Sequence, residues 1–402
     1  MNKPQPNLKG PFQPGITDPQ WPINAPAGIS PQESATYGTA YAGQIDRQSH
    51  LHIVKADINA GSRNELQDVL MNLSRFAARE MNRTPSRKYI PALDEIPRSY
   101  RVTITVGFGA SLFLTGAGDD RFDLRAFKPR YLKTMPSFYG DSPAFSPSQR
   151  ASDIIFLIAS DHIYVNVYLV GLLVNGEVDS RLLIRDVEQG YGRPDNHESG
   201  GFMDGISNPT NANPPGEMDN LTYIQPLDEE PDWCIHGTYL AYRKVQQNLK
   251  AFLTRDLNQK EKLFGIDKRS GQRLQPRPHG SHSFKLHPNR PDPDLFDCHD
   301  NERRFVRRPY FYFQGVDEGT ELRGLHHISF LRNLRKQYEW PIEMWQTNPD
   351  FPVSGTGVDN LYQIASNVGG GYYFCPRAQK SARDFLGSEM FTAYDKAHSA
   401  FK

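Results

Sequence analysis

The sequence indicates an α+β protein made of two ferredoxin-like units, each an antiparallel sheet with helices on its outer side. Three observations support this fold class. The chain has 402 residues, which is enough for two or three domains. The order strand, helix, strand, strand, helix, strand can be followed twice along it, and no short sequence repeat accompanies the second copy. We therefore expect a duplication of topology rather than of sequence.

The first half contains every element of one such unit. Alternating apolar residues predict its first strand, and Ser62 is placed to cap the helix that follows. Runs of β-branched residues predict the remaining strands. In chain order these elements are strand 50–58, helix 64–80, strand 101–109, strand 153–160 and strand 182–190. Residues 161–175 stay ambiguous, because their β-branched content suits a strand while their length suits a helix.

The second half repeats this order with aromatic strands. Its elements are strand 234–245, helix 246–265, strands 303–313 and 324–333, helix 335–345 and edge strand 372–377. We expect Pro341 to interrupt the second of these helices, since proline lacks the amide hydrogen that a helix interior uses.

We divide the chain into an N-terminal arm (1–40), an N-terminal half (41–215) that ends after a glycine-flanked acid, and a C-terminal half (216–402). Eight prolines fall between Pro4 and Pro31. Such a segment is extended, and it is either loose or laid across a neighbouring surface.

The composition excludes several classes of protein. Charged residues make up 23% of the chain and the formal net charge is zero, which gives no support for a nucleic-acid or membrane partner. No stretch approaches the roughly 18 apolar residues of a membrane span, and the start lacks the apolar core of a signal peptide. Cys234, Cys298 and Cys375 are isolated, which argues against a disulfide framework. We expect a cytoplasmic enzyme or small-molecule binder, and leave homo-oligomerisation open.

Residues 200–209 read GGFMDGISNP and hold an acid, Asp204, on a short loop. Gly201 and Gly205 allow a close backbone approach or a sharp turn, and the Asn-Pro pair ends any regular element. Taken alone this pattern is more typical of a surface turn than of a site.

Four histidines lie in a proline-rich stretch that precedes the last strands. They are His279, His282, His287 and His299. Clustered histidines could ligate a metal, although for any one of them the simpler interpretation is a polar loop residue.

A pair of arginines follows on a predicted strand. Arg307 and Arg308 must point to opposite faces, so one of them can face inward. A buried arginine needs a negative partner, which Asp204 or a ligand carboxylate could supply. The alternative is a solvated basic strand edge.

An acid, an arginine and a metal held from the far side are what the cleavage of peroxide requires. The acid carries a proton from one oxygen to the other, and the arginine stabilises charge as the oxygen–oxygen bond breaks.

Several segments, in order, resemble the dye-decolourising peroxidase family of haem enzymes. They are GFMDGISNP, GTYLAYRKVQQNLKAFL, SHSFKLHP, RRFVRRPYFYF and GGGYYFCP. The resemblance covers residues 150–376 well and 40–150 more loosely. It implies a duplicated ferredoxin-like fold with haem b (iron protoporphyrin IX) in the C-terminal half. It also implies reduction of hydrogen peroxide and oxidation of dye-like, phenolic or other small organic donors through a ferryl haem.

Residue by residue, the resemblance implies that Asp204 is the acid–base residue, Arg307 the charge-stabilising arginine and His282 the axial iron ligand. Gly201, Gly205 and Arg307 would contact the haem. His287 is the rival ligand to His282. Two alternative functions stay open: a non-catalytic haem-binding or haem-handling protein on the same fold, and a non-haem metal protein that uses the histidine cluster.

Overall fold

The computed structural model describes residues 5–19, 47–83, 100–145, 151–192, 197–198, 200–202, 204–205, 208–209, 214–286, 300–381 and 383–399. The strands in these ranges are β1 (His50–Ile58), β2 (Thr103–Gly109), β3 (Ile154–Ser160), β4 (Leu182–Tyr191), β5 (Thr238–Gln247), β6 (Val306–Arg307), β7 (Tyr310–Asp317), β8 (Thr320–Leu331) and β9 (Ala365–Cys375). Most lie where the sequence predicts them.

The α-helices are α2 (Arg63–Met81), α3 (Ile163–Val174), α4 (Glu217–Thr222), α5 (Leu249–Leu253), α6 (Leu257–Phe264), α7 (His282–Lys285) and α8 (Ser388–Ser399). Shorter 3-10 segments are η1 (Ala110–Leu112), η2 (Arg125–Phe127), η4 (Asp232–Cys234), η5 (Asp300–Arg303) and η8 (Asn360–Gln363), and π-helical segments are η6 (Arg335–Glu339) and η7 (Ile342–Gln346). Ser62 caps α2 as expected, since its side chain accepts a hydrogen bond from the Glu65 N–H. The ambiguous residues 161–175 form α3, which buries Val165, Leu169 and Leu173 at helical spacing.

The strands pair antiparallel in the order β5-β9-β2-β3-β1-β4-β7-β8-β6, and β5 also pairs with β8. The pairing therefore returns to its starting strand. Within each half the order is the same: β2-β3-β1-β4 in the first and β7-β8-β5-β9 in the second. The α+β class with antiparallel pairing is confirmed, and this repeated order is what two ferredoxin-like halves require.

The two halves do not keep separate sheets, which the sequence did not predict. They meet edge to edge where Phe108 and Gly109 of β2 pair with β9, and where Tyr191 of β4 pairs with Phe311 of β7. Ring closure covers strand edges that would otherwise be free to pair with another chain. The division at residue 215 stays a prediction.

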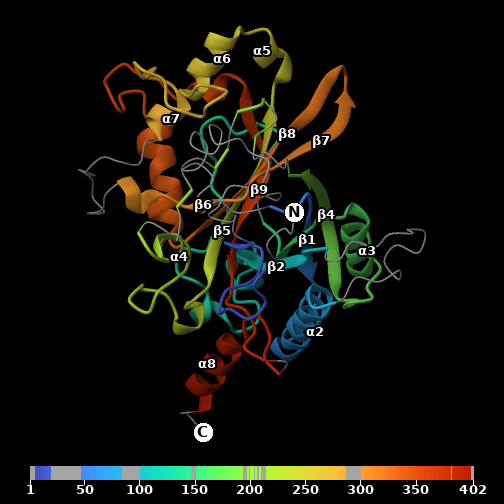
Figure 1. Cartoon of the computed structure of the whole chain (residues 1–402). Coiled ribbons are helices and arrows are strands. Elements are labelled where there is room, and N and C mark those ends of the chain that lie inside the picture. The colour runs from blue at the N-terminus through green and yellow to red at the C-terminus, as the bar shows by residue number, and fades with distance from the viewer. Residues whose placement is uncertain are drawn as a thin grey trace.

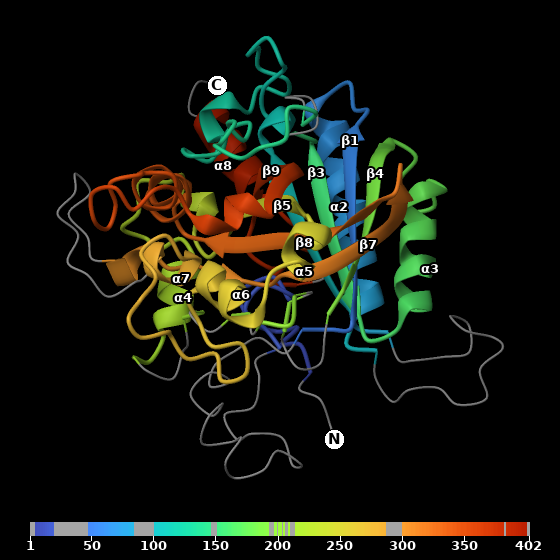
Figure 2. The same ribbon diagram turned by 90° about the horizontal axis from the view of Figure 1, so that it is seen from above.

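Side chains alternate between two apolar cores on opposite faces of the strands. On β1, Leu51 and Ile53 enter a core inside the ring, whereas Val54, Ala56 and Ile58 enter a larger core that α2 and α3 help to form. Figures 1 and 2 show α2 and α3 beside the strands of the first half, and α5, α6 and α7 at the second half. Helices therefore cover the outer face of the strands, as the fold class requires.

The described part of the N-terminal arm lies on the chain's own ring. Gln13 is buried, and its side-chain amide donates to the Val106 carbonyl (2.9 Å) and the Pro376 carbonyl (2.8 Å). Its side-chain oxygen accepts from the Val106 N–H at 2.9 Å. Ile16 enters the core inside the ring. The arm thus ties β2 to the end of β9 where their pairing is short; residues 20–40 lie outside the described ranges.

Two helix predictions need correction. Residues 246–265 form α5 and α6 rather than one helix, because Asp256 caps a new helix by accepting from the Gln259 N–H at 2.8 Å. Pro341 does not interrupt the later helix. The helical backbone continues through it between η6 and η7, whose wider π turns accommodate a residue without an N–H.

Two strand predictions also need correction. The strand expected at 303–313 divides into β6 and β7 around Pro309, which has no N–H to contribute to a ladder. The edge strand expected at 372–377 belongs to β9, which pairs with β5 on one side and β2 on the other. Ring closure turns this edge into an interior strand.

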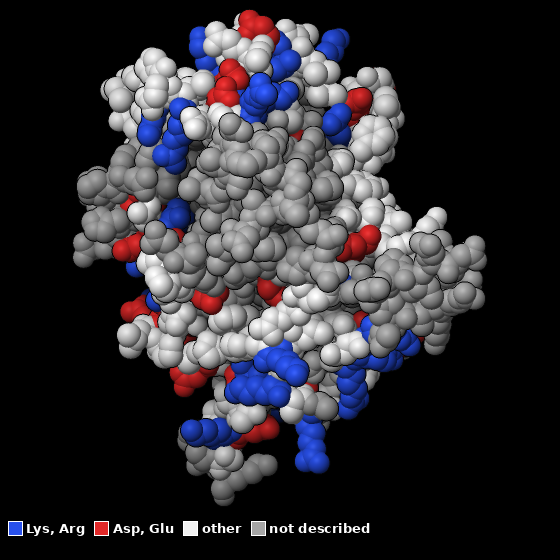
Figure 3. Space-filling view, in the orientation of Figure 1, with Lys and Arg blue, Asp and Glu red and all other residues white. Residues whose placement is uncertain are grey.

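Surface charge agrees with the balanced composition. On the face shown in Figure 3, acidic and basic side chains of the described residues are interspersed. Within the same described ranges, no helix has the length and apolar character that a membrane crossing needs.

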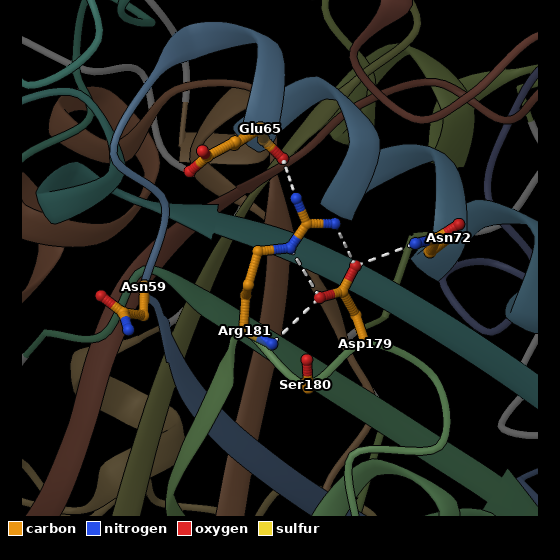
Figure 4. A pocket seen from close by; sticks show the side chains of 6 residues that line it. All are labelled: Asn59, Glu65, Asn72, Asp179, Ser180 and Arg181. Carbon is orange, nitrogen blue, oxygen red and sulfur yellow. Dashed lines mark hydrogen bonds and ion pairs between the residues drawn. The ribbon is translucent and has the colours of Figure 1, made fainter.

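A surface pocket between α2 and the turn before β4 is occupied by a structural ion pair (Figure 4). Arg181 binds Asp179 through its Nε (2.9 Å) and Nη2 (2.7 Å), and Asn72 donates to the same carboxylate at 2.9 Å. These hydrogen bonds connect α2 to the turn before β4, which gives Asp179 and Arg181 a structural role.

We expect Gln13→Ala to lower the free energy of unfolding by about 1–3 kcal/mol, because it leaves buried backbone groups of Val106 and Pro376 without a partner. Urea denaturation followed by circular dichroism measures this change. Lys9→Ala, on an exposed residue of the same arm, should shift it by less than about 0.5 kcal/mol. Equal unfolding midpoints for Gln13→Ala and the unaltered protein would contradict the role of Gln13.

Candidate active site

The acid loop has the left-handed backbone turns that its glycines allow. Gly201 and Gly205 have φ angles of 82° and 81°, a region that side-chain-bearing residues rarely adopt. Between them Phe202 is buried and stacks on Phe264 of α6, with ring centroids 4.2 Å apart. The Gly205 N–H donates to Asp204 Oδ1 at 2.6 Å. The loop therefore fixes the carboxylate rather than leaving it on a mobile surface turn.

Arg307 and Arg308 point to opposite faces, as strand geometry predicted. Arg308 is buried on one side, where its guanidinium donates to Gln48 Oε1 and to the Asp18 carbonyl of the N-terminal arm. Arg307 lies on the other side and faces the acid loop. The prediction that the two side chains point to opposite faces is therefore confirmed. Arg308 points into the protein interior, and Arg307 points toward the acid loop.

Asn208 fastens the acid loop to the arginine strand. Its side-chain amide donates to the Arg307 carbonyl at 2.9 Å, and its side-chain oxygen accepts from the Arg307 N–H at 3.0 Å. These two bonds satisfy the Arg307 backbone N–H and carbonyl as a neighbouring strand would. The asparagine of the Asn-Pro pair thus sets the position of Arg307 relative to Asp204, a role that its turn signature does not reveal.

Asp204 and Arg307 form an ion pair in a largely enclosed position. Arg307 Nη1 lies 3.3 Å from Asp204 Oδ1, and the two side chains keep 24% and 13% of their surface exposed. Burial is the largest single influence and raises the pKa of Asp204, but Arg307, Arg47, His327 and the Gly205 N–H together lower it by more, so the net pKa lies below its ordinary value. The carboxylate is therefore ionised in water at ordinary pH.

His282 begins α7 and is held by a buried carboxylate. Its Nδ1 lies 2.6 Å from Asp359 Oδ2, and the Asp359 side chain is fully buried. Asp359 is fixed in turn by the Leu361 N–H (2.9 Å) and by Gln346 Nε2 (3.2 Å). This arrangement directs Nδ1 to the carboxylate and leaves Nε2 as the nitrogen available to a metal.

Of the other predicted histidines, only His279 lies within the described ranges, and it does not join His282 in a metal site. His279 stacks on Phe284, with ring centroids 5.4 Å apart. In the part of the chain that the structure describes, no three His, Cys, Asp or Glu side chains gather to hold a metal ion. His287 and His299 fall outside that part, so the choice between His282 and His287 stays a prediction.

A residue that the sequence analysis did not single out lies among the predicted ones. His327, on β8, feels the charges of Arg307 and Asp204 on one side and of His282 on another. Burial is the largest cause of its lowered pKa, which falls to about 3. The charges that act on His327 thus include those of the three predicted site residues, Asp204, Arg307 and His282.

Asp359 and His327 had no local signal in the sequence. Asp359 is 77 positions from His282, and no spacing rule relates the two. His327 is one of two adjacent histidines on a strand, a pattern that alone does not identify which of them faces a site.

Two family models match the chain: "Dyp-type peroxidase, N-terminal" over residues 45–192 and "Dyp-type peroxidase, C-terminal" over residues 195–380. Among curated proteins, those named deferrochelatase from Escherichia coli O157:H7 and Shigella boydii serotype 4 are each 25% identical over 405 residues, which covers 91% of this chain and 90% of theirs.

Solved structures share the fold. A DyP-type peroxidase from Cellulomonas bogoriensis superposes with a TM-score of 0.68 at 20% identity, over 94% of this chain and 99% of that one. Ferric DtpA from Streptomyces lividans gives 0.70 at 19% identity, over 96% of each chain. A single-residue variant of DypB from Rhodococcus jostii RHA1, in complex with heme, gives 0.60 at 16% identity, over 83% of this chain and 95% of its own. The resemblance drawn from the sequence is confirmed: the chain belongs to the Dyp-type peroxidase family of haem-containing enzymes.

Proposed function

We propose that this chain is a haem-dependent peroxidase that reduces hydrogen peroxide and oxidises small organic donors such as dyes and phenols. The observation that carries the proposal is the pairing of Asp204 with Arg307 at 3.3 Å, together with a histidine, His282, that a buried carboxylate orients at 2.6 Å. An ionised acid beside an arginine suits proton transfer coupled to charge stabilisation.

The donor set fits haem b. His282 would hold the iron through Nε2, because Asp359 occupies Nδ1 and fixes the ring. Positive φ at Gly201 and Gly205 lets the acid loop approach a flat macrocycle without side chains between them. Haem, when bound, supplies the iron that binds peroxide and takes up its oxidising equivalents.

Asp204 and Arg307 would have different roles in the cleavage of peroxide. The Asp204 carboxylate removes a proton from one peroxide oxygen and delivers it to the other, which leaves as water. The Arg307 guanidinium stabilises the negative charge on the departing oxygen. Over the full cycle peroxide takes up two protons and two electrons to give two waters, and two donor molecules each lose one electron.

A second candidate function follows from the names of relatives. Proteins 25% identical to this chain are called deferrochelatase, the name of an enzyme that takes iron out of its chelate. On this alternative the chain handles haem rather than using it for peroxide reduction.

One experiment separates the two candidate functions: the haem-loaded protein is mixed with one equivalent of peroxide and its absorption and fluorescence are followed. A rapid shift of the Soret band supports the peroxidase. An unchanged band supports a haem carrier. The appearance of fluorescence from iron-free porphyrin supports an enzyme that removes the iron.

Replacement Asp204→Asn should slow the reaction with peroxide by about 100- to 10,000-fold while haem stays bound, because the amide cannot accept the proton. Stopped-flow absorption measures the rate. Asp317→Asn, at an exposed position on β7, is the control and should react at the rate of the unaltered protein. An unchanged rate in Asp204→Asn would remove Asp204 from the mechanism.

The pH profile should follow the lowered pKa of Asp204. A depressed carboxyl pKa keeps the base ionised above the ordinary value of 3.8 and loses it only as pH falls through the lower folded value. The rate constant for peroxide should therefore stay level from about pH 7 to about pH 4.5 and fall to half only at a pH below 3.8. A decline centred near pH 6 would instead assign the base to a histidine.

Replacement Asp359→Asn should lower haem affinity by about 10- to 100-fold, because His282 loses the charged carboxylate that orients it and keeps at most a weaker amide acceptor. Transfer of haem to apomyoglobin measures the affinity. His282→Ala should also abolish the axial nitrogen signature in the ferric spectrum. His279→Ala, on a neighbouring ring stacked against Phe284, should change neither property. Retention of the nitrogen signature in His282→Ala would favour His287 as the ligand.

A further inference from the structure

Adjacent histidines on β8 point to opposite faces and differ in their partners. His326 pairs across β5 with Lys244 and faces the inside of the ring. Its Nδ1 lies 3.0 Å from the Tyr242 hydroxyl and its Nε2 lies 3.0 Å from the Gln189 carbonyl. Both nitrogens of His326 are therefore used within the fold, and this residue has a structural role.

His327 occupies the site face of the same strand. It pairs with Arg243 of β5, while Ser329, two positions on, pairs with Arg307 of β6. Directly opposed residues and residues two apart on a strand share one face. The backbone register therefore places the His327 ring on the same side of the sheet as Arg307 and its partner Asp204.

One nitrogen of His327 remains available. Nδ1 lies 3.3 Å from the Ser329 hydroxyl, and the rings of Phe305 and Tyr338 lie with centroids 6.4 and 6.5 Å from the imidazole. Among the described residues Nε2 has no hydrogen-bond partner. When the Ser329 hydroxyl donates to Nδ1, the single proton of a neutral imidazole resides on Nε2, which becomes a donor.

The ring is neutral throughout the working range of pH. Burial is the main cause of its lowered pKa, and the cationic Arg307 is the next. Asp204 raises that pKa by less, and Arg243 lowers it again from the opposite strand. Arg243 is itself paired with Asp141 at 2.6 Å. A neutral N–H in this position offers a hydrogen bond without competing with Asp204 for a proton.

We propose that His327 is a further binding residue of the site, whose Nε2–H donates a hydrogen bond to a small oxygen or halide ligand held opposite His282. This inference rests on the proposed haem-dependent function. It gives the site a division of labour in which Asp204 moves the proton and His327 orients the ligand. It also explains why a polar ring, rather than an apolar one, lines the face beside Arg307.

Fluoride is a suitable probe, because it binds ferric haem and accepts strong hydrogen bonds without undergoing reaction. We would titrate it into haem-loaded protein and follow the absorption spectrum. His327→Phe should weaken fluoride binding by about 10-fold, the effect of losing one hydrogen bond. His327→Gln keeps a side-chain donor and should stay within about threefold of the unaltered protein. The effect should be constant from about pH 5 to pH 8, since the ring does not titrate there.

Other outcomes separate this inference from the proposed function. Absence of a Soret band in the haem-supplied unaltered protein would defeat the proposed function itself. A Soret band in His327→Phe with unchanged fluoride affinity would overturn the inference and leave the function standing. Nitrogen NMR of ¹⁵N-histidine-labelled, haem-free protein gives a test that no variant can confound. Protonation of His327 on Nε2 supports the proposal, and protonation on Nδ1 overturns it.

Discussion

The register of β8 is the constraint on which the candidate site depends. This strand pairs with β5, β6 and β7, and the pairing places Arg243, His327 and Ser329 in line with Arg307 on one face. A slip of one residue would exchange His327 for His326 and turn the whole polar row toward the inside of the ring. Closure of the ring opposes such a slip, because pairing on both sides fixes each interior strand in position.

Nearby positive charges allow the site to keep the Asp204 carboxylate ionised although it is largely buried. Burial raises the pKa of Asp204, but Arg307, Arg47 and other neighbours together hold it below its ordinary value. Burial is the main reason that His327 stays neutral, and the positive charge of Arg307 adds to it. Arg307 therefore favours both the charged carboxylate and the uncharged imidazole. A second carboxylate, Asp359, holds the His282 ring in position from a distant part of the sequence.

Local signals accounted for much of the fold and for part of the site. Alternation and capping located β1, β3 and α2 closely, since these patterns depend on neighbours in the chain. The positive φ of Gly205 and the divergence of Arg307 and Arg308 also follow from local rules. Some predictions failed at local breaks such as the Asp256 cap, and others failed where long-range pairing intervened. β9 looked like an edge because nothing near it in sequence shows that β2 lies beside it.

The sequence by itself determined the class of fold, the family and the residues whose chemistry suits peroxide, because residue type, period and ordered motifs are properties of the chain. Only the tertiary structure decided which side chains contact one another in the site. Asp359 meets His282 across 77 positions, and Asn208 meets Arg307 across 99. Which of two adjacent histidines faces the site was likewise settled by strand register. Such choices depend on contacts between distant segments, and those contacts exist only after the ring has closed.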